Sequence, residues 1–201
     1  MSFVTQPQSD TIRPMYRKSL EAIDCSTARA LDQVGEWWSL MLVRECLAGT
    51  KRFDDFQKHL GIARNVLTSR LAHLCEHGII EKTPLDGSER FFEYRLTAKG
   101  EALYPVLIAL LQWGDRWTGS GKGGPIKLVD HQTGEPIPTM GPRSADGRAL
   151  GFKDVRYEAR EHASKQTRKV IAQRNRHVLG IDDGSAGAED SQDDAEETRQ
   201  R

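Results

Sequence analysis

The residues best suited to chemistry lie in one short stretch of polar side chains at helical spacing. A helix over 63–76 would place Leu67, Leu71 and Leu74 on its core face. On or beside the opposite face it would expose hydrogen-bonding groups: Arg64, Asn65, Thr68 and Ser69. Asparagine pairs with adenine edges and arginine with guanine or a phosphate, so the N-terminal end of this helix has the chemistry to read DNA bases. Taken alone, the stretch also fits a solvated face in an all-α domain.

Further cations surround this stretch. Residues 51–73 hold five Lys or Arg against two Asp, a net charge of +3. Phosphate contacts fix the register of a protein on DNA without reading its sequence. Five cations are expected to contact the DNA backbone: Lys51, Arg52, Arg70, Lys82 and Arg90. Lys82 and Arg90 would do so from a hairpin beside the minor groove.

The three cysteines are too few and too widely spaced for a disulfide framework or a structural zinc site. Cys25 lies at a helix start, which lowers a thiol pKa, whereas the adjacent Asp24 would raise it. A redox sensor and a packing residue both remain open for Cys25. Cys46 and Cys75 lie among apolar helix positions, so we expect them to be buried and inert.

Enzymatic signals are weak. His73 and His77 are four residues apart on a helix, but no third ligand accompanies them, so a solvated face is favoured over a metal site. Neither a P-loop nor a hydrolase nucleophile motif occurs. We expect no cofactor, no metal and no catalytic activity.

A series of amphipathic helices must position these groups. Apolar spacing predicts helices over 26–34, 37–47, 53–60 and 63–76, with a short helix over 13–24 before them. Ser26 is the expected N-cap of the helix that it begins. Gly61 is the expected turn between the last two helices, which is the helix-turn-helix pattern. Trp37 and Trp38 are expected in the core.

A β-hairpin and a long helix come next. Ile79-Ile80 opens an extended segment, Asp86-Gly87 signals a hairpin turn, and 91–96 returns as a strand. Thr97 would cap a helix over 98–117 whose apolar stripe is wider than one small domain buries. We therefore expect a second copy of the chain to cover much of it: Leu103, Leu107, Leu110, Leu111 and Trp117. The order predicts a mainly α winged helix-turn-helix with a small β-hairpin.

The net charge is zero but unevenly distributed. Residues 182–201 carry eight acids against two arginines, a net −6, which leaves +6 on residues 1–181. No apolar run approaches the roughly 18 residues of a membrane helix. The N-terminus lacks a secretory signal, so we expect a cytoplasmic protein with no membrane association.

The composition divides the chain into five parts. We expect a flexible N-terminus (1–12), a DNA-binding and dimerisation domain (13–118), a linker (119–125), a small β/α extension (126–180) and an acidic disordered tail (181–201). A basic helix over 155–178 would add phosphate contacts or form only a solvated face. The tail would compete with DNA for that basic surface by mimicking phosphate.

Seven linked motifs occur between residues 24 and 118: Cys25–Leu31, Gly35–Leu40, Leu42–Glu45, Arg52–Phe56, Val66–Leu71, Leu74–Ile80 and Glu93–Gly100. As a set they resemble the HxlR family of transcriptional regulators, relatives of the MarR type. The resemblance implies a homodimer that binds a short inverted repeat of double-stranded DNA near promoters, as repressor or activator. The apolar dimer seam would offer a place for a small-molecule effector, and an oxidant is the other candidate effector. Some members sense oxidants through a Cys at the place of Cys25.

The sequence departs from the family at two places. Arg90 and Phe91 stand where the family often has Pro-Arg before the second wing strand. Some members also have a C-terminal knuckle with Cys ligands, but the comparable places here hold Thr133, Arg143 and Asp146, so no metal is expected. The alternative function is a winged-helix protein-interaction module whose recognition face no longer reads DNA.

Overall fold

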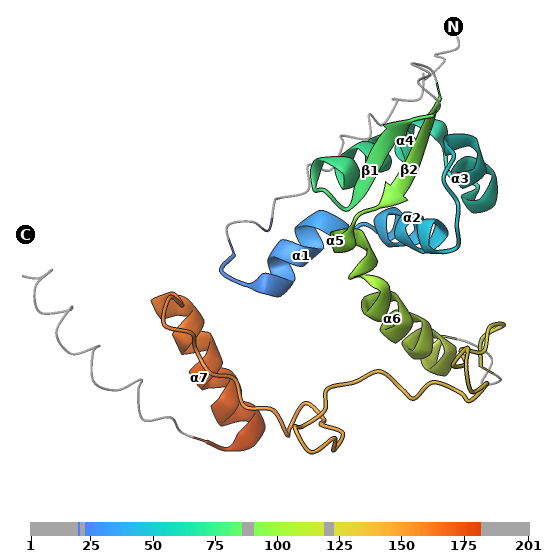
Figure 1. Cartoon of the computed structure of the whole chain (residues 1–201). Coiled ribbons are helices and arrows are strands. Elements are labelled where there is room, and N and C mark those ends of the chain that lie inside the picture. Colours follow the sequence, from blue (N-terminus) through green and yellow to red (C-terminus); the bar gives the residue numbers. More distant parts are fainter. Residues whose placement is uncertain (1–19, 21–22, 86–90, 119–122, 182–201) are drawn as a thin grey trace, which may run out of the picture.

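The computed structural model describes residue 20 and residues 23–85, 91–118 and 123–181 (Figure 1). Four helices come first, then a two-stranded hairpin and three further helices. Their bounds are α1 Ser26–Val34, α2 Trp37–Leu47, α3 Phe53–Leu60, α4 Arg64–Glu76, β1 Ile80–Pro84, β2 Phe92–Leu96, α5 Ala98–Glu101, α6 Tyr104–Trp117 and α7 Lys165–Leu179.

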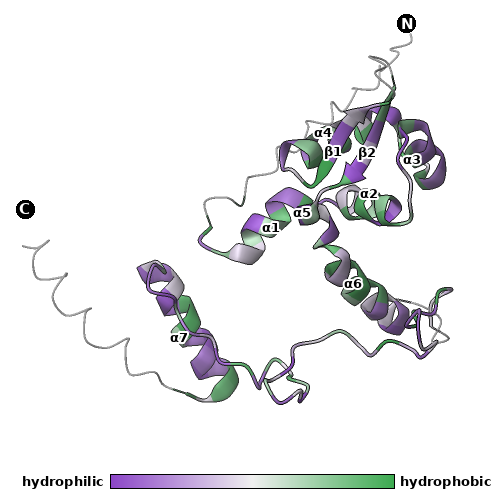
Figure 2. Ribbon diagram, in the orientation of Figure 1, coloured by the Kyte–Doolittle hydropathy of each residue, from purple (hydrophilic) through white to green (hydrophobic). Residues whose placement is uncertain are grey.

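One hydrophobic core joins α1 to α4 with the hairpin. Leu42, Val43, Phe56, Leu67 and Leu74 are fully buried in it. The apolar residues of α2 surround that helix rather than forming one stripe, so α2 lies centrally and contacts α1, α3, α4, α6 and β2 (Figure 2). The predicted helices over 37–47 and 53–60 are confirmed at both ends.

The helix-turn-helix is α3 and α4 with a three-residue joint. Gly61 ends α3 in the left-handed conformation at φ 61°, which a residue with a Cβ adopts only with strain. Ile62 is 2% exposed and anchors the joint in the core. α4 then begins at Arg64, one residue later than predicted, with Ala63 as its N-cap.

At α1 the predicted cap is wrong by one residue. Cys25 is the N-cap, in extended conformation, and Ser26 is the first helical residue. The Ser26 hydroxyl instead accepts a hydrogen bond from the Arg29 guanidinium at 3.0 Å.

The hairpin is antiparallel, with Ile80 opposite Leu96 and Pro84 opposite Phe92. The amide of Leu85 donates to the carbonyl of Phe91 at 2.8 Å and closes the pairing. Pro84 lies at the end of β1, where a missing amide costs little. The predicted turn at Asp86-Gly87 and the cation Arg90 lie outside the described residues.

The long helix expected over 98–117 is broken. Thr97 does cap its start, because its hydroxyl accepts from the amide of Gly100 at 3.2 Å. The helix stops at Glu101 and resumes at Tyr104 as α6. Pro105 explains the break: it has no amide to donate to Glu101, and its ring would clash with that carbonyl, whereas the first turn of a new helix accepts proline.

The extension contains two tight turns and then α7. Isolated β-bridges join Val129 to Pro136 and Arg143 to Ala149. The predicted helix over 155–178 is correct only from Lys165, where Ser164 caps α7 by accepting from the amide of Thr167 at 3.0 Å.

The residues before α7 run as an extended strap because α7 binds their backbone. Asn175, fully buried, accepts from the amide of Tyr157 at 3.1 Å and donates to its carbonyl at 2.8 Å. Arg174 donates to the carbonyls of Val155 and Phe152. These side-chain contacts replace the backbone bonds that a helix over 155–164 would have made.

One contact ties α7 to the start of α1. Oδ2 of Asp24 accepts from the Thr167 hydroxyl at 2.7 Å and from the amide of Ser164 at 3.2 Å. Oδ1 of Asp24 lies 3.8 Å from the Arg29 guanidinium. Hydrogen bonds from Thr167 and Ser164 lower the pKa of Asp24. In Figure 1, α7 consequently lies on the α1 side of the molecule, away from the hairpin.

Several expectations fall on residues that are not described. They concern the flexible segment 1–12, the helix over 13–24 apart from Leu20, Ile23 and Asp24, most of the linker 119–125, and the tail from residue 182. Among the described helices, each is too short or too polar to cross a membrane.

Candidate nucleic-acid interface

Helix α4 has two chemically distinct faces, as its sequence predicts. Leu67, Leu71 and Leu74 are at most 2% exposed and hold the helix on the core. The opposite face is exposed and consists of small or polar side chains: Asn65, Thr68, Ser69 and Ala72. Because none of these four is charged or bulky, the face can approach another surface closely.

Arg64 is positioned by residues of α3. Its guanidinium lies 4.8 Å from the ring centroid of Phe53, a cation–π distance, and 3.9 Å from a carboxylate oxygen of Asp54. Its side chain remains 72% exposed, so this weak pair leaves the cation accessible. Thr68 donates its hydroxyl proton to the carbonyl of Arg64 at 2.9 Å, which leaves its oxygen able to accept.

The backbone-contact candidates lie where α3 and the hairpin meet. The amide of Tyr94 donates to the carbonyl of Lys51 at 2.9 Å, which fixes the loop before α3 against β2. The Arg52 guanidinium lies 5.5 Å from the ring centroid of Phe91, and Nζ of Lys82 lies 3.9 Å from that of Phe92. The structure thus brings three of the five predicted cations to one region.

The other two are placed differently. Arg70 is half-buried on the flank of α4, and Arg90 is outside the described residues. Their backbone contacts stay predictions.

A buried carboxylate that the sequence analysis missed couples α2 to α3. Glu45 is 8% exposed and accepts from Nδ1 of His59 at 3.0 Å and from the Thr50 hydroxyl at 3.2 Å. Arg44 also donates to it, at 2.6 Å. Burial raises the pKa of Glu45, but hydrogen bonds from Arg44, His59 and Thr50 outweigh burial and leave the pKa lowered. An acid inside the mainly apolar segment 37–47 was the available signal.

Helix α6 carries the apolar stripe expected at a dimer interface. Leu103, Leu107 and Leu111 are half-buried, and the first two pack against the core. Leu110 and Trp117 are 48% and 64% exposed, so they remain uncovered in a single chain. The half-buried leucines of the stripe therefore pack within the domain, whereas its exposed residues can contact another surface.

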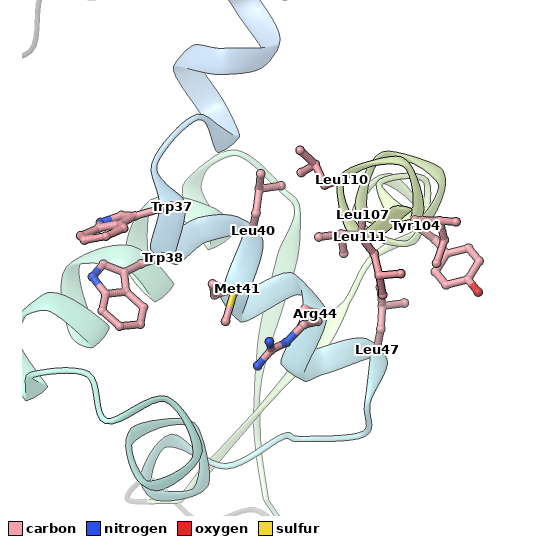
Figure 3. Close-up of a pocket in the computed structure, with 11 residues that line it drawn as sticks. Trp37, Trp38, Leu40, Met41, Arg44, Leu47, Tyr104, Leu107, Leu110 and Leu111 are labelled. Carbon is pink, nitrogen blue, oxygen red and sulfur yellow. The ribbon is translucent and has the colours of Figure 1, made fainter. Parts of the chain in front are cut away.

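A groove of about 720 Å³ lies between this stripe and α2 (Figure 3). Its lining is apolar apart from Arg44 and the Tyr104 hydroxyl, and includes Trp38, Leu40 and Met41 from α2. Trp37, expected in the core, is 75% exposed at the groove instead. Its ring packs on Trp38 with centroids 5.7 Å apart, because α2 turns Trp38 inward and its neighbour outward.

Cys25 is exposed and its thiol has a lowered pKa. Amide hydrogen bonds from Ala28 and Thr27, in the first turn of α1, lower it; Asp24, expected to raise it, is engaged with α7. Burial raises the pKa of Cys46 to about 12 and also raises that of Cys75. Both are half-buried rather than fully buried.

The histidine pair on α4 has structural contacts. The rings of His73 and His77 have centroids 4.4 Å apart, and Nε2 of His73 lies 3.0 Å from the carbonyl of Gln33. Within the described ranges, no three His, Cys, Asp or Glu side chains group as metal ligands.

Comparisons with known proteins agree on one class. A profile of the HxlR-like helix-turn-helix family matches residues 33–122. Rv3095 of Mycobacterium tuberculosis, an uncharacterized HTH-type transcriptional regulator, is 42% identical over 110 residues, which are 55% of this chain and 70% of the relative. The uncharacterized HTH-type transcriptional regulator sll1512 of Synechocystis is 34% identical over 94 residues, 46% of this chain and 70% of the relative.

Two solved structures, both given as candidate transcription factors, match at the level of the fold. PA1607 superposes with a TM-score of 0.65 at 39% identity, over 70% of this chain and 99% of that protein. PA1374 of Pseudomonas aeruginosa superposes with a TM-score of 0.53 at 38% identity, over 73% of this chain and 99% of that protein. With the two-faced α4, its glycine joint to α3 and the adjoining hairpin, these matches place the chain in the HxlR-like helix-turn-helix family of transcriptional regulators.

Proposed function

We propose that the chain binds an inverted-repeat operator as a homodimer and regulates transcription from it. The observation that carries the proposal is the exposed face of α4, which is polar, uncharged at its centre and flanked by Arg64. Residues 13–118 would form the DNA-binding and dimerisation domain. Because the chain's relatives are named as transcriptional regulators, the proposal includes no catalytic step.

In this proposal α4 enters the major groove by its N-terminal end. Asn65 would bond an adenine edge, Arg64 a guanine or a phosphate, and Thr68 and Ser69 neighbouring base edges. The lack of a bulky side chain on this face supports close approach to the groove floor.

Phosphate contacts would come from both sides of α4. Lys51 and Arg52 lie next to β2, Lys82 lies in β1, and Arg70 lies on the flank of α4. Arg90 would add a contact from the hairpin tip. These contacts would fix register on the DNA and make affinity depend on salt.

The exposed side of the α6 stripe supports the homodimer. Leu110, Trp113 and Trp117 are 48%, 58% and 64% exposed, and exposed apolar groups of this size on one helix are typical of an interface. A two-fold axis at α6 would present two copies of α4 to successive turns of DNA. Substitution of Leu110 by Glu should give a folded monomer by sedimentation, and a dimer of unchanged strength would contradict the proposal.

The decisive experiment selects genomic fragments with the purified protein at two salt concentrations. Enrichment of one inverted repeat, weakened at the higher salt and lost in Asn65→Ala, is the expected result. A folded dimer that enriches no fragment would favour the alternative, a winged-helix protein-interaction module. An effector, whether an oxidant at Cys25 or an apolar small molecule in the α2–α6 groove, would be sought afterwards by its release of the selected fragment.

A further inference from the structure

Helix α6 projects four apolar side chains that a single chain leaves exposed. Val106, Leu110, Trp113 and Trp117 are 46% to 64% exposed and lie within about 60° of one another around the helix. Trp113 and Trp117, about one turn apart, stand next to each other on this exposed side of the α6 stripe. We call them the tryptophan pair. Tryptophans are among the side chains that contribute most to interfaces, so the pair is suited to contact another surface.

The α2–α6 groove lies on the neighbouring face of the same helix. Tyr104, Leu107 and Leu111 line it from α6, about 120° around the helix from the exposed side of the stripe, and Trp38 and Met41 line it from α2 (Figure 3). Each chain therefore has a projecting apolar surface beside an apolar groove. A two-fold interface can use both at once, because each copy supplies the projection to the other's groove.

An antiparallel pairing of two α6 helices would bring the tryptophan pair to the partner's groove. Leu110 belongs both to the exposed side of the stripe and to the groove lining, so a two-fold axis beside Leu110 joins the two surfaces. About this axis Trp113 falls level with the partner's Leu107. Trp117, about 10 Å from Leu110 along the helix, falls within one residue of the partner's Tyr104. Both positions line the groove.

We propose that the partner's Trp113 and Trp117 fill the α2–α6 groove of each copy, so that the groove is complete only in the dimer. The inference rests on the homodimer proposed above and assigns the residues that hold it together. Arg44 also lines the groove and its side chain is 53% exposed, so its guanidinium can pack on the face of an indole ring. Arg116 makes the same kind of contact within the chain, 5.0 Å from the ring centroid of Trp117.

The area involved is enough for a specific interface. A tryptophan buries about 150–250 Å² when it is fully covered. Because the tryptophan pair is 58% and 64% exposed, the four tryptophans of a dimer still have about 400–600 Å² to bury, and the groove walls that they cover have about as much. The total of roughly 1,000 Å² reaches the lower bound for a specific interface before other contacts are counted.

Loss of the tryptophan pair should weaken the dimer. The full-length double variant W113A/W117A should dimerise about 10- to 100-fold more weakly in analytical ultracentrifugation, because truncated interface tryptophans cause large losses of affinity. F152A, which removes an aromatic ring that is 69% exposed in the extension, is the matched control and should leave the dimer Kd unchanged. All three side chains are exposed in the single chain, so circular dichroism should show an unchanged fold.

A complementation experiment tests the pairing of the two surfaces. Met41→Trp places a bulky side chain in the groove and should also weaken self-association. When it is mixed with W113A/W117A, the heterodimer regains one of the two contacts, since the intact tryptophan pair of one chain meets the intact groove of the other. By native mass spectrometry the heterodimer should exceed its statistical share of about one half. A share of about one half would overturn the inference.

The contact itself can be mapped by photo-cross-linking in the otherwise unaltered full chain. With p-benzoylphenylalanine in place of Trp113, in a mixture of isotopically light and heavy chains, links should join position 113 of one chain to residues 37–44 or 104–111 of the other. Position 152 with the same photoreactive side chain is the comparison and should not link to these residues.

Each outcome decides the inference. An unchanged dimer in W113A/W117A, or links that stay within one chain, would overturn it and leave the groove open to a small molecule. The expected links together with failure of the wild-type protein to select an operator would contradict the proposed DNA binding alone, because none of these measurements uses DNA.

Discussion

The guanidinium of Arg64, the first residue of α4, lies 4.8 Å from the ring centroid of Phe53, the first residue of α3. The two helices of the helix-turn-helix thus meet at their N-terminal ends through a cation and an aromatic ring. The contact orients Arg64 at the edge of the exposed face while most of its side chain remains in solvent.

This pairing predicts that Phe53 affects DNA binding without touching DNA. Phe53→Leu should weaken operator binding about two- to fivefold, as expected for loss of an exposed cation–π contact of about 0.5–1 kcal/mol. In the Arg64→Ala background the same change should have almost no further effect on Kd. Additive effects of the two substitutions in a double-mutant cycle would contradict the prediction.

Asn65 is predicted to carry sequence discrimination. Asn65→Ala should lower affinity for the selected operator about 5- to 150-fold, the equivalent of a lost base contact of about 1–3 kcal/mol, and leave random-sequence binding unchanged. Gln173→Ala, an exposed amide on α7, is the matched control. A uniform loss on both DNAs would instead assign Asn65 to the phosphates.

Gly100 is predicted to be required by packing. A Cβ there would lie 2.2 Å from the carbonyl oxygen of Ile79 and 2.8 Å from Cδ2 of Leu96. Gly100→Ala should therefore lower the free energy of unfolding by about 1–3 kcal/mol, the range for overpacked cores. Gly114→Ala in α6, where the nearest neighbour is 3.7 Å away, should raise it by about 0.5–1 kcal/mol. Urea unfolding at one protein concentration compares the two, and equal effects would refute the packing argument.

Glu45 is predicted to make stability depend on acid pH. Its folded-state pKa lies below the ordinary value of 4.5, so its contribution is present above pH 4.5 and is lost as pH falls through the lower folded-state pKa. Glu45→Gln should destabilise the fold at pH 7 and show a smaller loss of stability between pH 5 and pH 3 than wild type. Glu81→Gln, on the exposed surface of β1, is the control; parallel pH profiles for all three proteins would rule the prediction out.

Cys25 should be the most reactive of the three thiols. Its lowered pKa and exposure favour the thiolate, whereas Cys46, with a pKa of about 12, stays protonated. At pH 7 iodoacetamide should label Cys25 first, by mass spectrometry of timed digests, and Cys46 last. Labelling of Cys75 ahead of Cys25 would contradict this order. Cys25 would count as a redox sensor only if diamide releases the operator from the wild-type protein and not from Cys25→Ser.

Local patterns predicted the helices around the proposed site well. Segments 37–47, 53–60 and 63–76 combine apolar spacing with glycine ends, and a few neighbouring residues decide such helices. The exposed and buried faces of α4 followed from the same periodicity. The break at Pro105 was also local, but the continuous apolar stripe from Leu103 to Trp117 outweighed it in the prediction.

Other features depend on contacts between residues far apart in the sequence, which the spacing of apolar residues does not predict. The start of α7 is set by Ser164 and by Asn175 binding the backbone of Tyr157 eighteen residues earlier. The Glu45–His59 contact and the outward turn of Trp37 depend on which helices surround α2. The bond from Ser164 to Asp24 joins residues 140 apart, and no sequence window includes both.

The hydrogen bond from Ser164 to Asp24 bears on which part of the molecule unfolds first. Exposed hydrogen bonds contribute little net free energy, about 0.5–1.5 kcal/mol each, and the extension meets the winged helix through such bonds, from Asp24 to Ser164 and Thr167 and from Gln112 to Pro138 and Met140. Holding the two parts together also costs the closure entropy of the intervening chain. We therefore expect the amides of the extension to exchange with solvent hydrogen long before those of α2 and α4.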